Sequence, residues 1–279
     1  MKNVRVRLQE YQKQANGAEQ NLVRYLLEKP EQAAQLTVYQ IAEKNFTSPA
    51  TVVRFCKKVG FSGYREFLAA LNHENAVRRQ AHKDITTDIS PEDGVQDIVE
   101  KVTYRNIQAL EDTGRLLDTA EVSECVSLMQ RAHNIVLFGI GSSLLVARDS
   151  YLKFLRLNKP CLCNDDWHSQ LLSARNATPQ DVGIIISYSG LTEEMIRCAK
   201  ILKENGVPII AITRFSETSL TALADHKLYV AANELLVRTA ATASRISQLN
   251  VVDILFTAYV KLDYEKNMSC LSRNIIRKD

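Results

Sequence analysis

Apolar residues recur at helical spacing through the first part of the chain, and no strand-like alternation occurs before residue 80. A segment over 18–27 predicts an amphipathic helix, which Pro30 ends. The apolar residues of its face are Leu22, Val23, Leu26 and Leu27. Residues 75–92 are polar and predict a linker that leads into a connecting helix. That helix has Ile98, Val102, Ile107 and Leu110 on one side, and a further helix is predicted over 122–131.

From residue 135 onward, short apolar runs alternate with helical segments of about 10–15 residues. The predicted strands are 135–138, 160–163, 182–187, 207–213 and 227–230, and the predicted helices are 143–157, 167–174, 192–205 and 240–264. This alternation is typical of a parallel sheet with helices on both faces. The expected fold is therefore an all-α domain followed by a doubly wound α/β domain.

The change of pattern also predicts the domain boundaries. We expect an all-α domain over 1–77, a linker and connecting helix over 78–120, an α/β domain over 121–265 and a tail over 266–279. No apolar run approaches the roughly 20 residues needed to span a bilayer. The amino terminus is charged and lacks a signal-peptide core, so we expect a cytoplasmic protein.

Two short helices with a tight turn are predicted within 36–67. Residues 38–44 form the first, with Ile41 and Ala42 on its inner face. Ser48 is a favoured N-cap and Pro49 a favoured first helical residue, so a second helix begins there. Gly60 closes it. This pattern predicts a helix-turn-helix, the unit that places its second helix in the major groove of DNA.

Charge supports an anionic polymer as the partner of this domain. Residues 1–83 hold 14 lysines and arginines against 7 acidic residues, whereas the remainder holds 21 against 25. We assign Ser48, Ala50 and Thr51 to base edges and Arg54, Lys57 and Lys58 to phosphates, and add Tyr64 to the DNA-binding set. The alternative is a helical bundle with a basic face.

Two predicted strands end in turns rich in glycine and hydroxyl groups. The first turn, in "VLFGIGSSLLVARD", contains Gly139, Gly141, Ser142 and Ser143, and the second, in "IIISYSGLTEE", contains Ser187, Ser189 and Thr192. A single turn of this kind is usually only a helix cap. Two such turns at the carboxyl ends of parallel strands predict a cradle for an anion, held by helix N-termini.

Other ligand classes fit less well. "GIGSSL" lacks the third glycine of a dinucleotide fingerprint, no P-loop lysine is present, and "SYSGL" is not a nucleophile elbow. The six cysteines form no zinc-site spacing, with Cys161 and Cys163 as an isolated C-x-C. We expect no metal, no cofactor and no catalytic residue.

The first domain resembles the RpiR family of bacterial transcription regulators. "IAEKNFTSPATVVRFCKKVGFSGYREF" matches the family pattern at 13 positions, namely Ile41, Ala42, Ser48, Ala50, Thr51, Val52, Arg54, Phe55, Lys58, Gly60, Phe61, Gly63 and Tyr64. Where the family often has glycine then valine in the turn, this chain has Phe46 and Thr47. Because phenylalanine with positive φ is strained, we expect Asn45 to take the left-handed conformation instead.

The second domain resembles the SIS (sugar isomerase) domain, a flavodoxin-like module that binds phosphosugars. The matching pieces are "GIGSS" and "SYSGLTEE". The resemblance implies a sugar-phosphate site formed by Gly141, Ser142, Ser143, Ser187, Ser189, Gly190, Thr192 and Glu194. His168 in "DDWHSQ", the counterpart of a D-x-H-x-Q segment in relatives, and Glu234 in "NELLVRTAATASRIS" are further candidates. Each is equally well explained as an ordinary polar or ion-paired residue.

Together the two resemblances imply a homo-oligomeric transcription regulator of a sugar or amino-sugar catabolic operon. We expect a repressor that binds operator DNA as a dimer or dimer of dimers and responds to a sugar phosphate. One alternative is a cytoplasmic sugar-phosphate isomerase, which needs a general base that no motif here supplies. Another is a sugar-phosphate-binding module with only protein partners, which leaves the basic helix-turn-helix unexplained.

Overall fold

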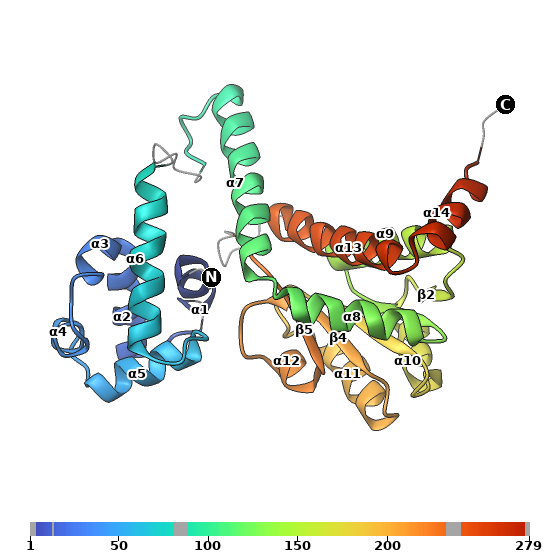
Figure 1. The fold of residues 1–279 in the computed structure, drawn as a ribbon, viewed down its shortest axis with the longest axis horizontal. Helices are drawn as coiled ribbons and strands as arrows, with labels where there is room; N and C mark the ends of the chain where they lie inside the picture. Colours follow the sequence, from blue (N-terminus) through green and yellow to red (C-terminus); the bar gives the residue numbers. More distant parts are fainter. Residues whose placement is uncertain (1–3, 13, 81–88, 233–240, 277–279) are drawn as a thin grey trace. The chain divides into compact units, whose positions relative to one another are not determined.

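The computed structural model describes residues 4–12, 14–80, 89–232 and 241–276 (Figure 1). The chain divides into two compact units, residues 1–116 and 117–279. This division places the connecting helix with the first unit, whereas we expected a separate connecting segment over 78–120. Glu234 lies outside the described residues.

The first unit is all-α. Its helices are α1 (Val4–Gln12), α2 (Ala18–Glu28), α3 (Pro30–Ala33), α4 (Val38–Lys44), α5 (Pro49–Lys58), α6 (Tyr64–Gln80) and α7 (Val95–Leu116). The helices predicted from the apolar pattern are present, and α4 begins and ends at the predicted residues. Helix α6 continues to Gln80, so part of the segment predicted as a linker is helical.

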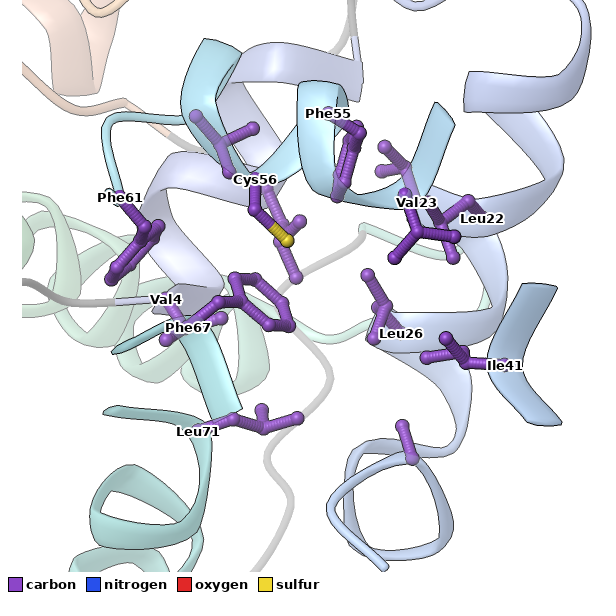
Figure 2. Close-up of a cluster of buried hydrophobic side chains, with 14 of the residues drawn as sticks. Val4, Leu22, Val23, Leu26, Ile41, Phe55, Cys56, Phe61, Phe67 and Leu71 are labelled. Atoms are coloured by element: carbon purple, nitrogen blue, oxygen red, sulfur yellow. The ribbon is translucent and has the colours of Figure 1, made fainter. Parts of the chain in front are cut away.

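The core of the first unit fixes the second helix of the helix-turn-helix. The ring of Phe55 on α5 is fully buried and meets Tyr11 edge-on at 5.6 Å and Phe67 at 6.5 Å. Figure 2 shows Phe55 and Cys56 among apolar side chains of α1, α2, α4 and α6. One face of α5 is thereby held in the core, and the opposite face is left to solvent.

The turn between α4 and α5 corrects the expectation for Asn45. Asn45 has φ −109° and is buried, and its side-chain amide donates to the Ile41 carbonyl at 2.8 Å. Phe46 takes the left-handed conformation instead, with φ 53°. The amides of Phe46 and Thr47 donate to carbonyls of α4 in the pattern of a Schellman motif, which requires a left-handed residue at the Phe46 position.

The second unit is α/β. Its strands are β1 (Ile135–Phe138), β2 (Cys161–Cys163), β3 (Val182–Ile186), β4 (Ile209–Arg214) and β5 (His226–Val230). Its helices are α8 (Thr119–Arg131), α9 (Ser142–Arg156), α10 (Trp167–Asn176), α11 (Glu193–Glu204), α12 (Ser219–Leu223), α13 (Thr242–Leu262) and α14 (Tyr264–Arg273). Each predicted strand is present, and α12 was missed. Asp263 separates α13 from α14, so the expected tail begins as a helix.

The five strands are parallel and lie in the order β2-β1-β3-β4-β5. This order confirms the doubly wound, flavodoxin-like prediction. Helices α10, α11 and α12 cover one face through a core that includes Ala174, Met195 and Leu220. On the other face, α13 contacts both α8 and α9 (Figure 1). Since β1 and β3 are buried along their whole length, their ends are fixed in position.

A buried carboxylate ties the amino ends of the two central strands. Asp181, directly before β3, accepts hydrogen bonds from the amide and side chain of Asn134 at 3.1 and 2.7 Å. It also accepts from the amide and hydroxyl of Thr178 at 2.8 and 3.0 Å. Burial raises the pKa of Asp181, but these hydrogen bonds outweigh it and hold the pKa below its usual value.

We therefore expect Asp181 to stabilise the fold above its unfolded-state pKa of about 3.9, and this contribution to be lost as pH falls through the lower folded-state pKa. Asp181→Asn should lower the free energy of unfolding at pH 7 by about 1.5–3 kcal/mol. Urea unfolding at pH 7 and pH 3 checks this. The variant should lose less stability than the wild type between the two pH values, and an equal loss would contradict the assignment.

Candidate functional site

The two hydroxyl-rich turns follow the carboxyl ends of β1 and β3, the adjacent strands between which the strand order reverses. Phe138 at the end of β1 pairs with Ile185 near the end of β3. The turn after each strand then leads into a helix, α9 or α11. Since β2 and β4 lie on opposite sides of this pair, the turns flank the crevice in which doubly wound folds bind ligands.

Gln170 on α10 holds the first turn. The Gly139 amide donates to its side-chain oxygen at 3.2 Å, and its side-chain nitrogen donates to the Gly139 carbonyl at 2.9 Å. Gln170 is 1% exposed, so both hydrogen bonds are shielded from water. A Cβ atom on Gly139 would lie 2.8 Å from the Ser143 carbonyl oxygen, so the turn closes tightly on α9.

The second turn is held by Gly190, which has φ 64°. A Cβ atom there would lie 2.4 Å from the Thr218 hydroxyl at the start of α12. Ser187 is buried and donates from its hydroxyl to the Thr192 hydroxyl at 3.3 Å. The Ser189 hydroxyl accepts from the Leu191 amide at 3.2 Å and remains half-buried. Three hydroxyls therefore gather within six residues.

These hydroxyls do not cap the helix that follows them. Thr192 is the N-cap of α11, yet its side chain makes no capping hydrogen bond. The N-cap of α9 is Gly141, which has no side chain to offer. The neighbouring helices α8, α10 and α12 are each capped by their N-cap side chain. Because the amides and positive dipole ends of α9 and α11 are uncapped at the switch point, the arrangement suits an anion with several oxygens.

Helix α13 adds buried polar groups behind the first turn. The Ser143 hydroxyl is buried and lies 3.4 and 3.5 Å from the two side-chain amide atoms of Gln248. Ser247, also buried, donates to the Ala231 carbonyl at 2.7 Å. Ser143 is thus turned toward α13, whereas Ser142, one residue earlier, is half-buried at the start of α9.

Two further predicted ligand residues that the structure describes, Glu194 and His168, follow the carboxyl ends of β3 and β2. Glu194 is half-buried in the first turn of α11. His168 is exposed on α10, which follows β2, one strand away from the switch point. Asp166 caps α10 by accepting from the Ser169 amide at 2.9 Å, and these hydrogen bonds from Ser169 lower the pKa of Asp166. The buried side chain of "DDWHSQ" is Gln170, the glutamine of the D-x-H-x-Q pattern, which was not among the predicted ligand residues.

The described residues contain no group of three or more histidine, cysteine or acidic side chains placed to hold a metal ion. Burial is the main cause that raises the pKa of the Cys161 thiol to about 12 and of the Cys163 thiol to about 11, so neither is an activated nucleophile.

The candidate DNA-binding surface is the exposed face of α5. The Ser48 hydroxyl accepts from the Thr51 amide at 3.1 Å, as predicted for an N-cap, and lies 2.9 Å from the Thr51 hydroxyl. Arg54 donates to that hydroxyl at 3.4 Å. Ala50 and Lys57 are exposed beside them. Hydroxyl groups thus lie at the amino end of the helix and cations further along it.

Two other predicted DNA contacts have partners within the first unit. Lys58 pairs with Glu19 at 2.8 Å. Burial raises the pKa of Glu19, but Lys58 and Tyr11 outweigh it, so the pKa is lowered. The Tyr64 hydroxyl donates to the Leu36 carbonyl at 2.8 Å, and its ring stacks on Phe67 with centroids 6.3 Å apart. Burial raises the pKa of Tyr64 to about 12, so its hydroxyl stays protonated.

A helix-turn-helix unit with a basic second helix, joined to a doubly wound unit with an anion cradle, defines a DNA-binding transcription regulator with a ligand-binding domain. Comparison with known families agrees. Residues 2–78 match the family described as helix-turn-helix domain, rpiR family, and residues 128–258 match the SIS domain. The chain belongs to the RpiR family of HTH-type transcriptional regulators, which confirms the resemblance.

Relatives and solved structures extend this similarity over nearly the whole chain. The HTH-type transcriptional regulator YbbH of Bacillus subtilis is 36% identical, covering 89% of this chain and 87% of its own. The structure of the Vibrio vulnificus NanR protein complexed with ManNAc-6P is 25% identical, with a TM-score of 0.61 over 97% of this chain and 96% of that one. The sugar isomerase domain of an RpiR transcription factor from Sphaerobacter thermophilus is 21% identical, with a TM-score of 0.58 over 64% of this chain and 98% of that one, and shows the same fold.

Within the described segments, no helix combines the length and apolar character that a membrane crossing requires.

Replacing Gln170 tests whether it holds the first turn. Gln170→Met keeps the bulk of the side chain but leaves the amide and carbonyl of Gly139 without these partners, so the free energy of unfolding should fall by at least about 1–3 kcal/mol. Gln130→Met, on the exposed face of α8, is the matched control and should change stability by less than about 0.5 kcal/mol. Urea unfolding followed by circular dichroism measures both. Equal stabilities would show that Gln170 does not fix the turn.

Proposed function

We propose that this protein represses a sugar or amino-sugar catabolic operon and that a sugar phosphate bound at the carboxyl ends of β1 and β3 controls its DNA binding. The observation that carries the proposal is the pair of uncapped helix N-termini at the switch point, those of α9 and α11. A phosphate group suits the free amides and positive dipole ends of these two helices.

We assign the phosphate to the second turn. Hydroxyl donors come from Ser187, Ser189 and Thr192. Gly190 has no side chain, so the backbone can approach the phosphate closely. We assign the sugar to the first turn, with Gly141, Ser142 and Ser143. The further sugar contacts that we propose are His168, Glu194 and Glu234. The complex of the Vibrio vulnificus NanR protein with ManNAc-6P supports a sugar phosphate as the ligand class.

For the first unit, we propose that Ser48, Ala50 and Thr51 face base edges while Arg54 and Lys57 contact phosphates. Lys58 and Tyr64 belong to the same surface, but their contacts with Glu19 and Leu36 also hold the unit together. Because helix-turn-helix proteins bind paired half-sites, we propose a homodimer or dimer of dimers on the operator. The relatives are named as regulators, and we propose no catalytic role.

Removing one hydroxyl of the second turn tests the ligand site. Thr192→Val keeps the shape of the side chain and removes no capping bond. It does remove the acceptor of the 3.3 Å hydrogen bond from Ser187, so we expect the protein to stay folded with at most a small loss of stability, which urea unfolding measures alongside. Affinity for the sugar phosphate should fall by about 1.5–3 kcal/mol, which is the value of a charge-assisted hydrogen bond. Thr119→Val, on the exposed first turn of α8, is the control and should bind like the wild type.

The ligand is found first by a thermal-shift screen of phosphorylated hexosamines, hexoses and pentoses that begins with ManNAc-6P. A true ligand stabilises the protein by about 2.7 kcal/mol at a hundredfold excess over Kd. Calorimetric titration of wild type and variants then gives the affinities, with the unphosphorylated sugar as a further control. If Thr192→Val binds as tightly as wild type, or if the unphosphorylated sugar binds equally well, the phosphate assignment is wrong.

Reciprocal coupling tests the regulatory proposal. If the sugar phosphate releases DNA, operator affinity should fall about 5- to 150-fold at saturating ligand, and operator should weaken ligand binding by the same factor. Fluorescence anisotropy on DNA, with and without ligand, measures the first quantity, and ligand titration with and without DNA measures the second. Sedimentation velocity of the complex should show at least two chains per DNA site. Unchanged affinities in both comparisons would leave two binding sites without a switch.

A further inference from the structure

The turn of the helix-turn-helix carries a residue that its backbone disfavours. Phe46 occupies the left-handed position of the Schellman motif that ends α4. The Phe46 amide donates to the Glu43 carbonyl at 3.1 Å, and the Thr47 amide donates to the Ala42 carbonyl at 2.9 Å. Glycine is the usual residue at this position because a Cβ atom crowds the neighbouring carbonyl oxygen. A phenylalanine here therefore strains the backbone.

The ring of Phe46 recovers none of this cost through burial. Phe46 is 92% exposed, whereas the three other phenylalanines of the first unit, Phe55, Phe61 and Phe67, are at most 3% exposed. An exposed aromatic ring is also unfavourable in water. Glycine would relieve both the strain and the exposure, so the free chain gains nothing from phenylalanine at this position. Strain of this kind is characteristic of functional positions.

The position of Phe46 indicates what the ring meets. It lies two residues before Ser48, the N-cap of α5, at the end of the helix where the Ser48 and Thr51 hydroxyls lie. Arg54 and Lys57 are exposed along the same helix. When the amino end of α5 enters the major groove, the ring is carried to the edge of the groove. The apolar group that the groove presents there is the 5-methyl group of thymine.

We propose that Phe46 is a specificity-determining residue whose ring packs against a thymine 5-methyl group at the edge of the major groove. The inference rests on the proposed DNA-binding role of α5 and goes beyond it, because it assigns a base preference to the turn. A contact of this kind neutralises no phosphate. Its loss should therefore lower affinity without changing the dependence of affinity on salt.

The test uses the full-length protein and a DNA site selected by the wild type from a random pool. Phe46→Gly relaxes the turn, so its folding stability should be equal or higher. Its affinity for the selected site should fall at least fivefold, with an unchanged slope of log affinity against log salt. Tyr39→Ala removes another exposed aromatic ring, from α4, and as the control it should leave affinity unchanged.

Thymine-to-uracil substitution identifies the contact. Uracil lacks only the 5-methyl group, so replacing one particular thymine should weaken wild-type binding about fourfold, the value of burying one methyl-sized group. The same replacement should leave binding of Phe46→Gly unchanged. If no such thymine exists, or if Phe46→Gly binds DNA as tightly as the wild type, the proposal is overturned. It is also overturned if Phe46→Gly changes only the oligomeric state, because the ring would then contact protein.

Arg54→Ala separates this proposal from the underlying function. Loss of one phosphate contact should weaken binding to all sequences and reduce the salt slope by about 0.9. If Arg54→Ala has this effect while Phe46→Gly has none, α5 still reads DNA and only the inference about Phe46 fails. If the wild type selects no DNA from the pool, both fail.

Discussion

The ligand site depends on one constraint, the reversal of strand order between β1 and β3. Two helices, α9 and α11, begin after these adjacent strands on opposite faces of the sheet, and neither is capped by a side chain. An N-cap contributes about 0.5–2 kcal/mol to stability, so the free chain leaves a favourable interaction unused at each helix. A bound anion would supply it. Gln170 and Thr218 lie against the glycines of the two turns, which keeps these amides in place.

The helix-turn-helix departs from local preference in a similar way. Its core is conventional, since Phe55 fixes α5 through aromatic contacts and Ser48 caps the helix. The unfavourable element is Phe46, whose strain the surrounding hydrogen bonds maintain. In both units the buried core sets the geometry. The unfavourable features, which are the two uncapped helix N-termini and the strained Phe46, lie at turns. Such local departures from an otherwise consistent sequence are expected at functional sites.

The sequence predicted the order and type of most elements because their apolar patterns are strong, as in the buried apolar runs Ile135–Phe138 and Val182–Ile186. It did not reveal Gln170, because its partner Gly139 is distant in sequence and close only in the folded sheet. The conformation of Phe46 was predicted wrongly because asparagine tolerates positive φ better. Burial of the Asn45 side chain against Ile41 outweighed that preference. Helix α14 was also missed, because its mostly polar sequence after Asp263 was assigned to the tail.

The connecting helix restricts how a ligand signal could reach the DNA-binding unit. Helix α7 belongs to the first unit and contacts α1 there. Asp112 on α7 is buried, and burial raises its pKa to about 6 despite Arg115, one turn along the same helix, at 3.1 Å. The covalent link to the second unit is Leu117 and Asp118, and Asp118 caps α8. A ligand can alter DNA affinity only by favouring one of two arrangements. Any part of that change that is passed along the chain, from the second unit to the helix-turn-helix, crosses this short link.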